Sequence, residues 1–547
     1  MRRDLLYSIS ILFFLVFFSL TVNSQVKPLT VAESSNYTKT SLYCDVISFV
    51  QKLQKQSPYL RVETLGKSAE GRGIPLLIIG NPLPSSPLDL KYDNRAVVYI
   101  QANIHAGEVE GKEVSLMLAR DILQDNNLPF LEDLVLLITP IFNPDGNEKI
   151  SAENRRNQKG PEEVGIRYNG QNLDLNRDAI KLESPEVRNM VEKILNRWDP
   201  VMLVDCHTTN GSYHQEPVTF VWGFNPNGDT TLIEYMHKKV TPFIKKNMKE
   251  EYDVLAVEYG HFMSYEDLEK GWQPAGPQVR YITNYMGLRN RLALLDENYA
   301  YADFKTRVEG CYAFLHSVLE YCSENREEIQ NLIQEADKKT IARGLHPAPA
   351  DSFAVEYDQN PYEEKITLRG YEMKIIPREN RWPRIEKLDK ERVYKLPYYC
   401  HYTPKRSVRF PHAYLLSLHE DNIINKLQQH GITVERLTES ATLEVEEFLI
   451  SEVDARERPY QGHYMNSLKG EYRMVEKHFD KGTLFVTTAQ RLGNLIAYLL
   501  EPESDDGLAV WNFFDQYLTR QWGRGFGVYP VYKLYNPENL ARETVEK

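Results

Sequence analysis

Four continuous apolar runs in the N-terminal half of the chain limit the folds that are open to it. Runs rich in Val, Ile and Leu without polar alternation are typical of strands that are buried on both faces. Helix-like segments at residues 109–123 and 184–197 lie between these runs. Strands that alternate with helices predict an α/β fold with a mixed, mainly parallel sheet flanked by helices. The runs are residues 74–80, 95–104, 134–143 and 200–207.

The length of the chain, 547 residues, predicts two folded domains, because a single core of ordinary size does not extend so far. A long helix-like stretch ends at Gly344, and short tyrosine-rich strand candidates follow it. We place the boundary near residue 330. The first domain then spans residues 25–330. The second, an accessory domain of unassigned role, spans residues 331–547, and its strand and helix candidates predict a mixed α/β or α+β fold.

The first residues have the pattern of a secretory signal peptide. Arg2 and Arg3 precede an apolar run, and small side chains before the end of the segment suit cleavage after Ser24. We therefore expect residues 1–24 to be removed and the protein to be exported, to the periplasm or outside the cell, with no stable membrane insertion after the cut. The alternative is an uncleaved membrane anchor, since the run is close to spanning length.

Composition excludes some classes of function. With 42% apolar and 26% charged residues, the chain reads as a water-soluble globular protein. A net charge of −12 opposes attachment to nucleic acid or to anionic lipid, both of which need a basic face. The five cysteines are an odd number. Cys311 and Cys322 share one helix-like stretch, about 16 Å apart and beyond disulfide reach, so we expect no disulfide framework.

A histidine and a glutamate follow the second apolar run. If residues 95–104 form a strand, His105 and Glu108 lie just past its carboxyl end, where open α/β sheets place their sites. His207 ends another buried run in the same way. Three such ligands on one Zn²⁺ leave the fourth position for water, which is the arrangement of a catalytic site. The alternative for the first pair is a solvated loop, because so short a pattern is common by chance. Asp205 suits either the orientation of a ligand imidazole or a purely structural polar role.

Six short segments resemble, in order and in spacing, those of the zinc carboxypeptidases of the carboxypeptidase A type. The resemblance implies the fold of that family, one zinc ion held by His105, Glu108 and His207, and hydrolysis of the C-terminal bond of peptides. It also implies that Glu297 is the general base, since a carboxylate beside zinc can take a proton from water and deliver it to the leaving amine. Between residues 38 and 323 the segments are GKSAEGR, HAGE, NPDG, LDLNRD, DCH and LLDEN.

The same resemblance assigns residues that contact the substrate. Asn176 and Arg177 match the pair that binds the terminal carboxylate, for which a planar guanidinium is well suited. Arg72 matches an arginine that contacts the peptide further from its end. Arg155 matches the arginine that stabilises the oxyanion, and Arg156 is the alternative in the next register.

One feature of the family has no single match here. A mobile tyrosine closes over the terminal residue of the substrate, and Tyr265, Tyr281 and Tyr285 are all candidates for it. Arg280, just before Tyr281, suits either an additional contact to the carboxylate or a surface position, and we favour the surface position. The acidic segment at residues 499–514 is interpreted as a turn with acidic helix-start chemistry.

Taken with the signal pattern, these motifs predict an exported, zinc-dependent metallocarboxypeptidase that acts on peptides. The sequence assigns it no oligomeric state and no nucleic-acid partner. A second enzymatic prediction is a zinc peptidase or amidase that acts on cell-wall stem peptides. A prediction of another class is a catalytically inactive peptide-binding protein that keeps the fold.

Overall fold

The computed structural model describes residues 27–124, 130–209, 212–379, 384–418, 421–520, 522–523 and 525–546. The predicted signal peptide, residues 1–24, lies outside the described residues. Among the residues that are described, no helix combines the length and the apolar character needed to cross a membrane.

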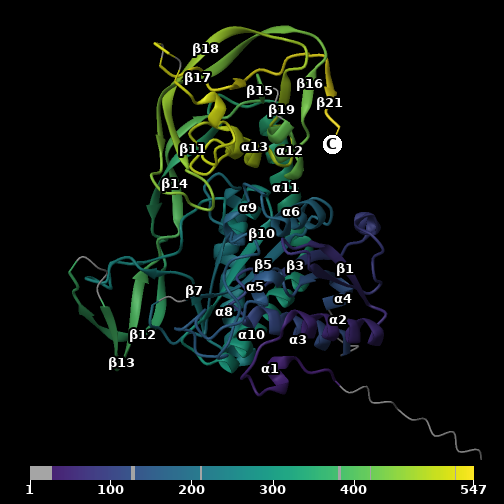
Figure 1. The fold of residues 1–547 in the computed structure, drawn as a ribbon, viewed down its shortest axis with the longest axis vertical. Coiled ribbons are helices and arrows are strands. Elements are labelled where there is room, and N and C mark those ends of the chain that lie inside the picture. Colours follow the sequence, from purple (N-terminus) through teal and green to yellow (C-terminus); the bar gives the residue numbers. More distant parts are fainter. Residues whose placement is uncertain are drawn as a thin grey trace, which may run out of the picture.

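A mixed sheet of eight strands forms the centre of the N-terminal region (Figure 1). Its strand order is β1-β2-β4-β3-β5-β10-β6-β7. The pairs β3–β4, β3–β5, β5–β10 and β6–β7 are parallel, and the other three are antiparallel. The mixed, mainly parallel sheet is therefore confirmed, and each of the four apolar runs overlaps one of its strands. The strands are β1 (Leu60–Lys67), β2 (Gly73–Ile79), β3 (Ala96–Ala102), β4 (Leu134–Thr139), β5 (Met202–Thr209), β6 (Val218–Trp222), β7 (Ala256–Glu258) and β10 (Leu292–Tyr299).

Helices cover both faces of this sheet (Figure 1). Alternate strand residues enter different cores: Val98 and Ile100 of β3 pack into the first, Val97 and Tyr99 into the second. The first core includes α2 (Tyr43–Gln56), α3 (Glu110–Gln124), α8 (Thr241–Tyr252) and α10 (Phe304–Glu324), and the second includes α6 (Pro185–Met190) and α9 (Ile282–Leu288). Shorter elements of this region are α1 (Val31–Ser34), α4 (Phe130–Asp133), α5 (Pro144–Asn147), α7 (Thr230–Tyr235), β8 (His261–Phe262) and β9 (Trp272–Gln273).

The C-terminal region follows the long helix α11 (Arg326–Leu345), within which the predicted boundary near residue 330 lies. A seven-stranded sheet of order β18-β17-β20-β15-β19-β16-β21 forms its centre, and all of its pairings are antiparallel. Antiparallel strands with separate helices make this region α+β, one of the two predicted folds. Its elements are β11 (Ser352–Asn360), β12 (Lys365–Ile376), β13 (Arg384–Pro397), β14 (His401–Arg409), β15 (Ala413–Leu416), α12 (Asp421–Gln429), β16 (Glu435–Leu437), β17 (Ala441–Ala455), β18 (Asn466–Phe479), β19 (Leu484–Thr487), α13 (Gly493–Leu500), β20 (Val531–Leu534) and β21 (Arg542–Thr544).

The two regions share a hydrophobic core. Tyr99 of β3, Tyr285 of α9 and Trp511 of the C-terminal region all belong to it. Arg280 lies at the same junction. Its interpretation as a surface residue is wrong, because the side chain is buried, with 8% of the residue exposed, and its guanidinium Nη2 lies 3.0 Å from Asp506 Oδ1. The acidic segment forms turns, as predicted, but its acids follow the end of α13 and lead into further turns, so the predicted helix-start chemistry is wrong. Asp506 of this segment is the anion that pairs with the buried Arg280 guanidinium.

Candidate active site

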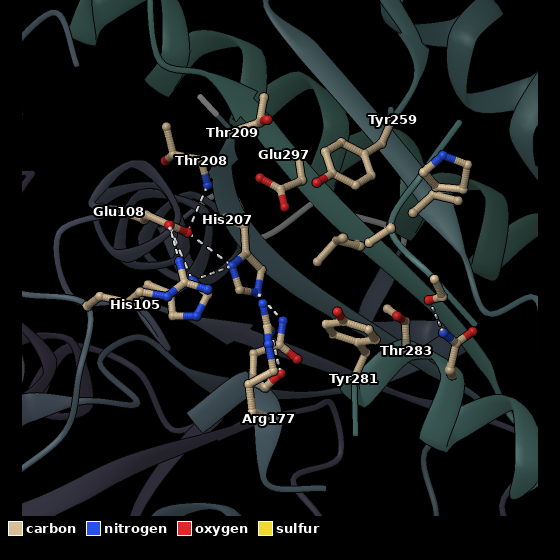
Figure 2. A pocket seen from close by; sticks show the side chains of 18 of the residues that line it. His105, Glu108, Arg177, His207, Thr208, Thr209, Tyr259, Tyr281, Thr283 and Glu297 are labelled. Carbon is tan, nitrogen blue, oxygen red and sulfur yellow. Dashed lines mark hydrogen bonds and ion pairs between the residues drawn. The ribbon is translucent and has the colours of Figure 1, made fainter. Parts of the chain in front are cut away.

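Two histidines and a glutamate meet at the carboxyl ends of β3 and β5 (Figure 2). The Nδ1 atoms of His105 and His207 lie 3.0 Å apart. Glu108 Oε2 lies 3.0 Å from His207 Nδ1, and Glu108 Oε1 lies 3.2 Å from His105 Nδ1. All three residues are buried, and their donor atoms lie within 4.8 Å of one another. The structure therefore brings the three predicted ligands to one point.

The turn after β3 sets the spacing of the first two ligands. Asn103 adopts the left-handed conformation, with φ of +65°, and its Nδ2 donates to the backbone oxygen of Glu108. The Glu108 N–H donates to the His105 carbonyl at 2.9 Å, which closes the turn. Gly107 has no room for a side chain, since a Cβ atom there would meet the Gly165 carbonyl oxygen at 2.7 Å. This tight turn places both side chains on the same side of the backbone.

A carboxylate contacts the Nε2 atom of each histidine, on the side of the ring away from the shared point, and orients the ring. His105 Nε2 lies 2.9 Å from Asp174 Oδ1, and His207 Nε2 lies 2.8 Å from Asp205 Oδ2. Gln101 Nε2 donates to the other oxygen of Asp205 at 3.1 Å. Carboxylates accept hydrogen bonds, so each Nε2 carries the proton and each Nδ1 presents its lone pair to the shared point. Of the two roles left open for Asp205, the contacts support the orientation of a ligand imidazole.

The charges around this point favour a cation. Burial disfavours the imidazolium of His207, but Asp205 and Glu108 outweigh burial and raise its pKa. Burial also opposes ionisation of Glu108, yet His105 and Arg155 hold the pKa of its carboxyl well below the usual range. Two imidazole nitrogens and a carboxylate are a donor set that suits Zn²⁺. The residues present therefore fit a zinc ion.

Glu297 lies beside the three ligands, on strand β10. β10 pairs in parallel with β5, and Glu297 stands directly opposite His207 in the register. Its carboxylate lines the same cavity (Figure 2). Burial and the neighbouring Glu108 raise the pKa of Glu297 to about 7, although His207 opposes them. A carboxyl group that titrates near neutrality can both accept and return a proton.

Three arginines had to be distinguished near the site. Arg155 lines the cavity; its Nη1 donates to Glu108 Oε1 at 3.0 Å and its Nη2 to the Thr208 carbonyl at 2.9 Å. The side chain of Arg156 is 74% exposed and pairs with Glu153. The contacts therefore place Arg155, rather than Arg156, at the cavity.

The third of these, Arg167, was missed by the sequence analysis. It lines the cavity, with Nη1 3.7 Å from Glu108 Oε1 and Nε donating to Asp174 Oδ2 at 2.8 Å. Arg167 stands outside the six matched segments, so no motif pointed to it. Its place between Glu108 and Asp174 is a consequence of the fold alone.

The predicted carboxylate-binding pair also lines the cavity, with Asn176 Nδ2 3.3 Å from His207 Nε2. Asn176 and Arg177 both line it, and the Arg177 guanidinium carbon lies 4.6 Å from the ring centre of Tyr281. Of the three candidate tyrosines, Tyr281 lines the cavity, whereas Tyr285 is buried against His430. The remaining wall is mostly uncharged: Thr208, Thr209, Val221, Phe224, Tyr259, Pro274, Ala275, Gly276, Thr283, Asn284 and Leu295.

Arg72 is the predicted site residue that the structure does not bring to the cavity wall. Its Nη1 donates to Asp145 Oδ1 and to Glu70 Oε2, both at 2.7 Å. Asp145 belongs to the NPDG segment at the start of α5. These contacts hold the loop before β2 against α5, and a substrate contact by Arg72 stays a prediction.

The sequence is similar to those of known carboxypeptidases. Residues 46–214 match the family model described as zinc carboxypeptidase. Carboxypeptidase 2 of Trichophyton rubrum is 22% identical over 509 residues, which cover 89% of this chain and 85% of that protein. The probable carboxypeptidase 2 of Arthroderma benhamiae is 21% identical over 484 residues, covering 84% of each. A solved metallo-carboxypeptidase from Burkholderia cenocepacia is similar at a TM-score of 0.38 and 20% identity, over 51% of this chain and 68% of that one. The family match contains His105, Glu108 and His207 and ends before Glu297.

Proposed function

We propose that the chain carries a zinc carboxypeptidase domain and that the protein is an exported enzyme that removes single residues from the C-terminal ends of peptides. It holds one zinc ion at His105, Glu108 and His207. The observation that carries the proposal is the meeting of these ligands with Glu297 and Arg177 in one cavity. A metal site, a proton acceptor and a carboxylate-binding group are together what hydrolysis of a terminal peptide bond needs.

Glu297 and Arg155 have separate roles beside the metal. Zinc, when bound, supplies a Lewis acid that activates water and polarises the scissile carbonyl. Glu297 accepts the proton of the attacking water and delivers it to the departing amine. The guanidinium of Arg155 is held by the Thr208 carbonyl, so it is fixed in advance to face the oxygen that becomes negative.

Asn176 and Arg177 set the position of the bond that is cut. The Ile282 N–H donates to Asn176 Oδ1 at 3.2 Å, and Arg177 packs over Tyr281. Both side chains are thus held on the side of the cavity that lies towards α9. A free carboxylate bound there places the last peptide bond, and no other, beside Glu297.

Export is supported by the basic start and the apolar run of residues 1–24. We propose that cleavage follows Ser24 and that the mature enzyme meets peptides in the periplasm or outside the cell. N-terminal sequencing of the protein recovered from the exported fraction tests this. An N-terminus at Gln25 is expected, and retention of Met1 in a membrane fraction would show an anchor instead.

The activity itself is tested with a mixed peptide pool and the purified mature protein, read out by mass spectrometry. We expect the loss of single C-terminal residues, abolished by a chelator and restored by added zinc. Peptides with an amidated C-terminus should remain intact, because they present no carboxylate to Arg177.

Two matched variants complete the experiment. Glu297→Gln keeps the shape of the side chain and removes the proton acceptor, so the pool should remain unchanged. Glu309→Gln makes the same chemical change on the exposed face of α10 and should leave the activity intact. An unchanged pool with wild-type protein that holds zinc would contradict the proposal, and cell-wall stem peptides would be tested next.

A further inference from the structure

The turn that joins β17 to β18 reaches the catalytic region from the C-terminal region. β17 and β18 form a long antiparallel pair, and the chain continues beyond them before it turns back. Tyr460 and His463 exchange two backbone hydrogen bonds, of 2.8 and 3.0 Å. Gln461 and Gly462 between them have φ values of +51° and +85°. Positive φ at both central residues is typical of a two-residue hairpin turn. We call residues 460–463 the β17–β18 tip.

Two side chains of the β17–β18 tip contact the predicted carboxylate-binding segment. Tyr460 Oη accepts a hydrogen bond from Arg177 Nε at 3.0 Å. Gln461 Oε1 accepts one from the backbone N–H of Asp174 at 2.8 Å. Asp174 is the residue that orients His105. The tip thus contacts both ends of the short helical turn that carries Asn176 and Arg177.

The contact with Tyr460 engages one of the hydrogen-bond donors of the Arg177 guanidinium and leaves another for a ligand. Nε donates to Tyr460, and Nη1 donates to the Asn176 carbonyl at 2.7 Å. Within the described part of the chain, Nη2 has no hydrogen-bond partner. The flat face packs over Tyr281, which lines the cavity (Figure 2). With Nε and Nη1 both donating inside the protein and one face stacked, Nη2 is left to donate to an anion in the cavity.

The β17–β18 tip is itself held firmly against the catalytic region. The ring centroids of Tyr460 and Trp511 lie 6.2 Å apart with the planes stacked, and the Arg280 guanidinium carbon lies 5.5 Å from the Tyr460 ring. Asp506 accepts hydrogen bonds from both Arg280 and Trp511. His463, at the other end of the tip, lies 2.9 Å from Glu183. Because the tip is fixed at both ends, Tyr460 can hold the Arg177 side chain in one rotamer.

We propose that Tyr460 and Gln461 are positioning residues of the substrate site, which hold Arg177 and its segment ready for the C-terminal carboxylate of a peptide. The C-terminal region is then a part of the substrate site and not an appendage to it. This inference rests on the proposed function, because it assigns the carboxylate to Arg177. Its physical basis is preorganisation: a long side chain that is ordered before binding costs less free energy when the ligand arrives.

The test compares a ligand that carries the carboxylate with one that lacks it. N-acetylphenylalanine and its amide differ only in that group, and their neutral side chain suits the uncharged wall of the cavity. For Tyr460→Phe we expect the KM of free-carboxylate peptides and the Ki of N-acetylphenylalanine to rise about threefold to tenfold. The kcat and the Ki of the amide should change less than twofold, because Tyr460 contacts no reacting atom. Gln461→Met should act in the same direction.

Two controls separate positioning from a general loss of structure. Tyr464→Phe removes a hydroxyl from the same loop, where the residue is 54% exposed, and should change none of these constants. In an Arg177→Lys background, Tyr460→Phe should have almost no further effect, since the hydroxyl acts through the guanidinium. A purely structural role would give additive losses in the same background.

The results that would overturn the inference are distinct from a failure of the proposed function. If the wild type releases C-terminal residues while both tip variants keep KM and Ki within twofold, the positioning role is wrong. If the wild type releases nothing, the proposed function fails. Calorimetric binding of N-acetylphenylalanine and its amide then decides the role of the tip, which is refuted if Tyr460→Phe weakens both equally or neither.

Discussion

The carboxylate behind His207 offers a direct test of how the metal site is built. Asp205 is completely buried and accepts hydrogen bonds from His207 Nε2 and from Gln101 Nε2. Asp205→Asn keeps the size of the side chain but removes its charge, which lowers the basicity of the His207 nitrogen that faces the metal. Loss of such a partner weakens metal binding by about 10-fold to 100-fold, or about 1.4 to 2.8 kcal/mol. We expect a zinc dissociation constant raised by that factor.

Asp174→Asn should weaken zinc binding further than Asp205→Asn does. Asp174 accepts from His105, from Arg167 and from the Asn176 backbone, so its replacement releases more than one partner. Burial opposes the ionisation of Asp174, but His105, Arg177 and Arg167 stabilise its carboxylate and hold its pKa well below the usual range. We therefore also expect Asp174→Asn to have a lower zinc affinity than Asp205→Asn.

The assay is a competition titration of each folded variant against a chromogenic zinc chelator at fixed pH and salt. Asp337→Asn is the matched control: Asp337 is buried and pairs with Arg291, but shares no partner with the site. Its zinc affinity should equal that of the wild type. An affinity of Asp205→Asn within threefold of the wild type would refute the reasoning, since it would mean that His207 needs no charged partner.

Other predictions concern the base, the pH profile and the junction of the two regions. Glu297→Gln should lower kcat by about 10²-fold to 10⁴-fold without loss of bound zinc, measured by elemental analysis beside peptide kinetics; loss of the metal would contradict the role of a base. Because only ionised Glu297 accepts a proton, kcat/KM should fall as the pH is lowered. The apparent pKa of this fall should lie at or below about 7, since a bound cation lowers the pKa of Glu297. The same fall in a slow Glu297→Gln variant would exclude the assignment to Glu297. Asp506→Asn leaves the Arg280 guanidinium buried without its anion, so urea unfolding should show a loss of about 3 to 5 kcal/mol, and a loss below about 1 kcal/mol would argue against a buried ion pair.

Much of the central sheet and the metal centre could be predicted from the order of the residues. Strands buried on both faces need continuous apolar runs, and these are visible without knowledge of the fold. Parallel strands meet at their carboxyl ends, so His105 and His207, which follow or end such runs, were expected to lie together. Glu297 needed the family resemblance, because a carboxylate at the end of a strand is common on its own.

Only the tertiary structure decided which side chains surround that centre. Arg167 belongs to no motif, and Tyr281 could not be chosen from three candidate tyrosines until the cavity wall was known. Arg280 looks like a surface residue in the sequence, because its buried partner, Asp506, lies more than two hundred positions later in the chain and no local pattern indicates the pairing. The contact of Tyr460 with Arg177 likewise joins residues 283 positions apart. Local patterns determine strands, turns and ligands because their causes lie within a few residues. Which charges and hydroxyl groups meet across two regions depends on how those regions pack, and short-range periodicity carries no information about that.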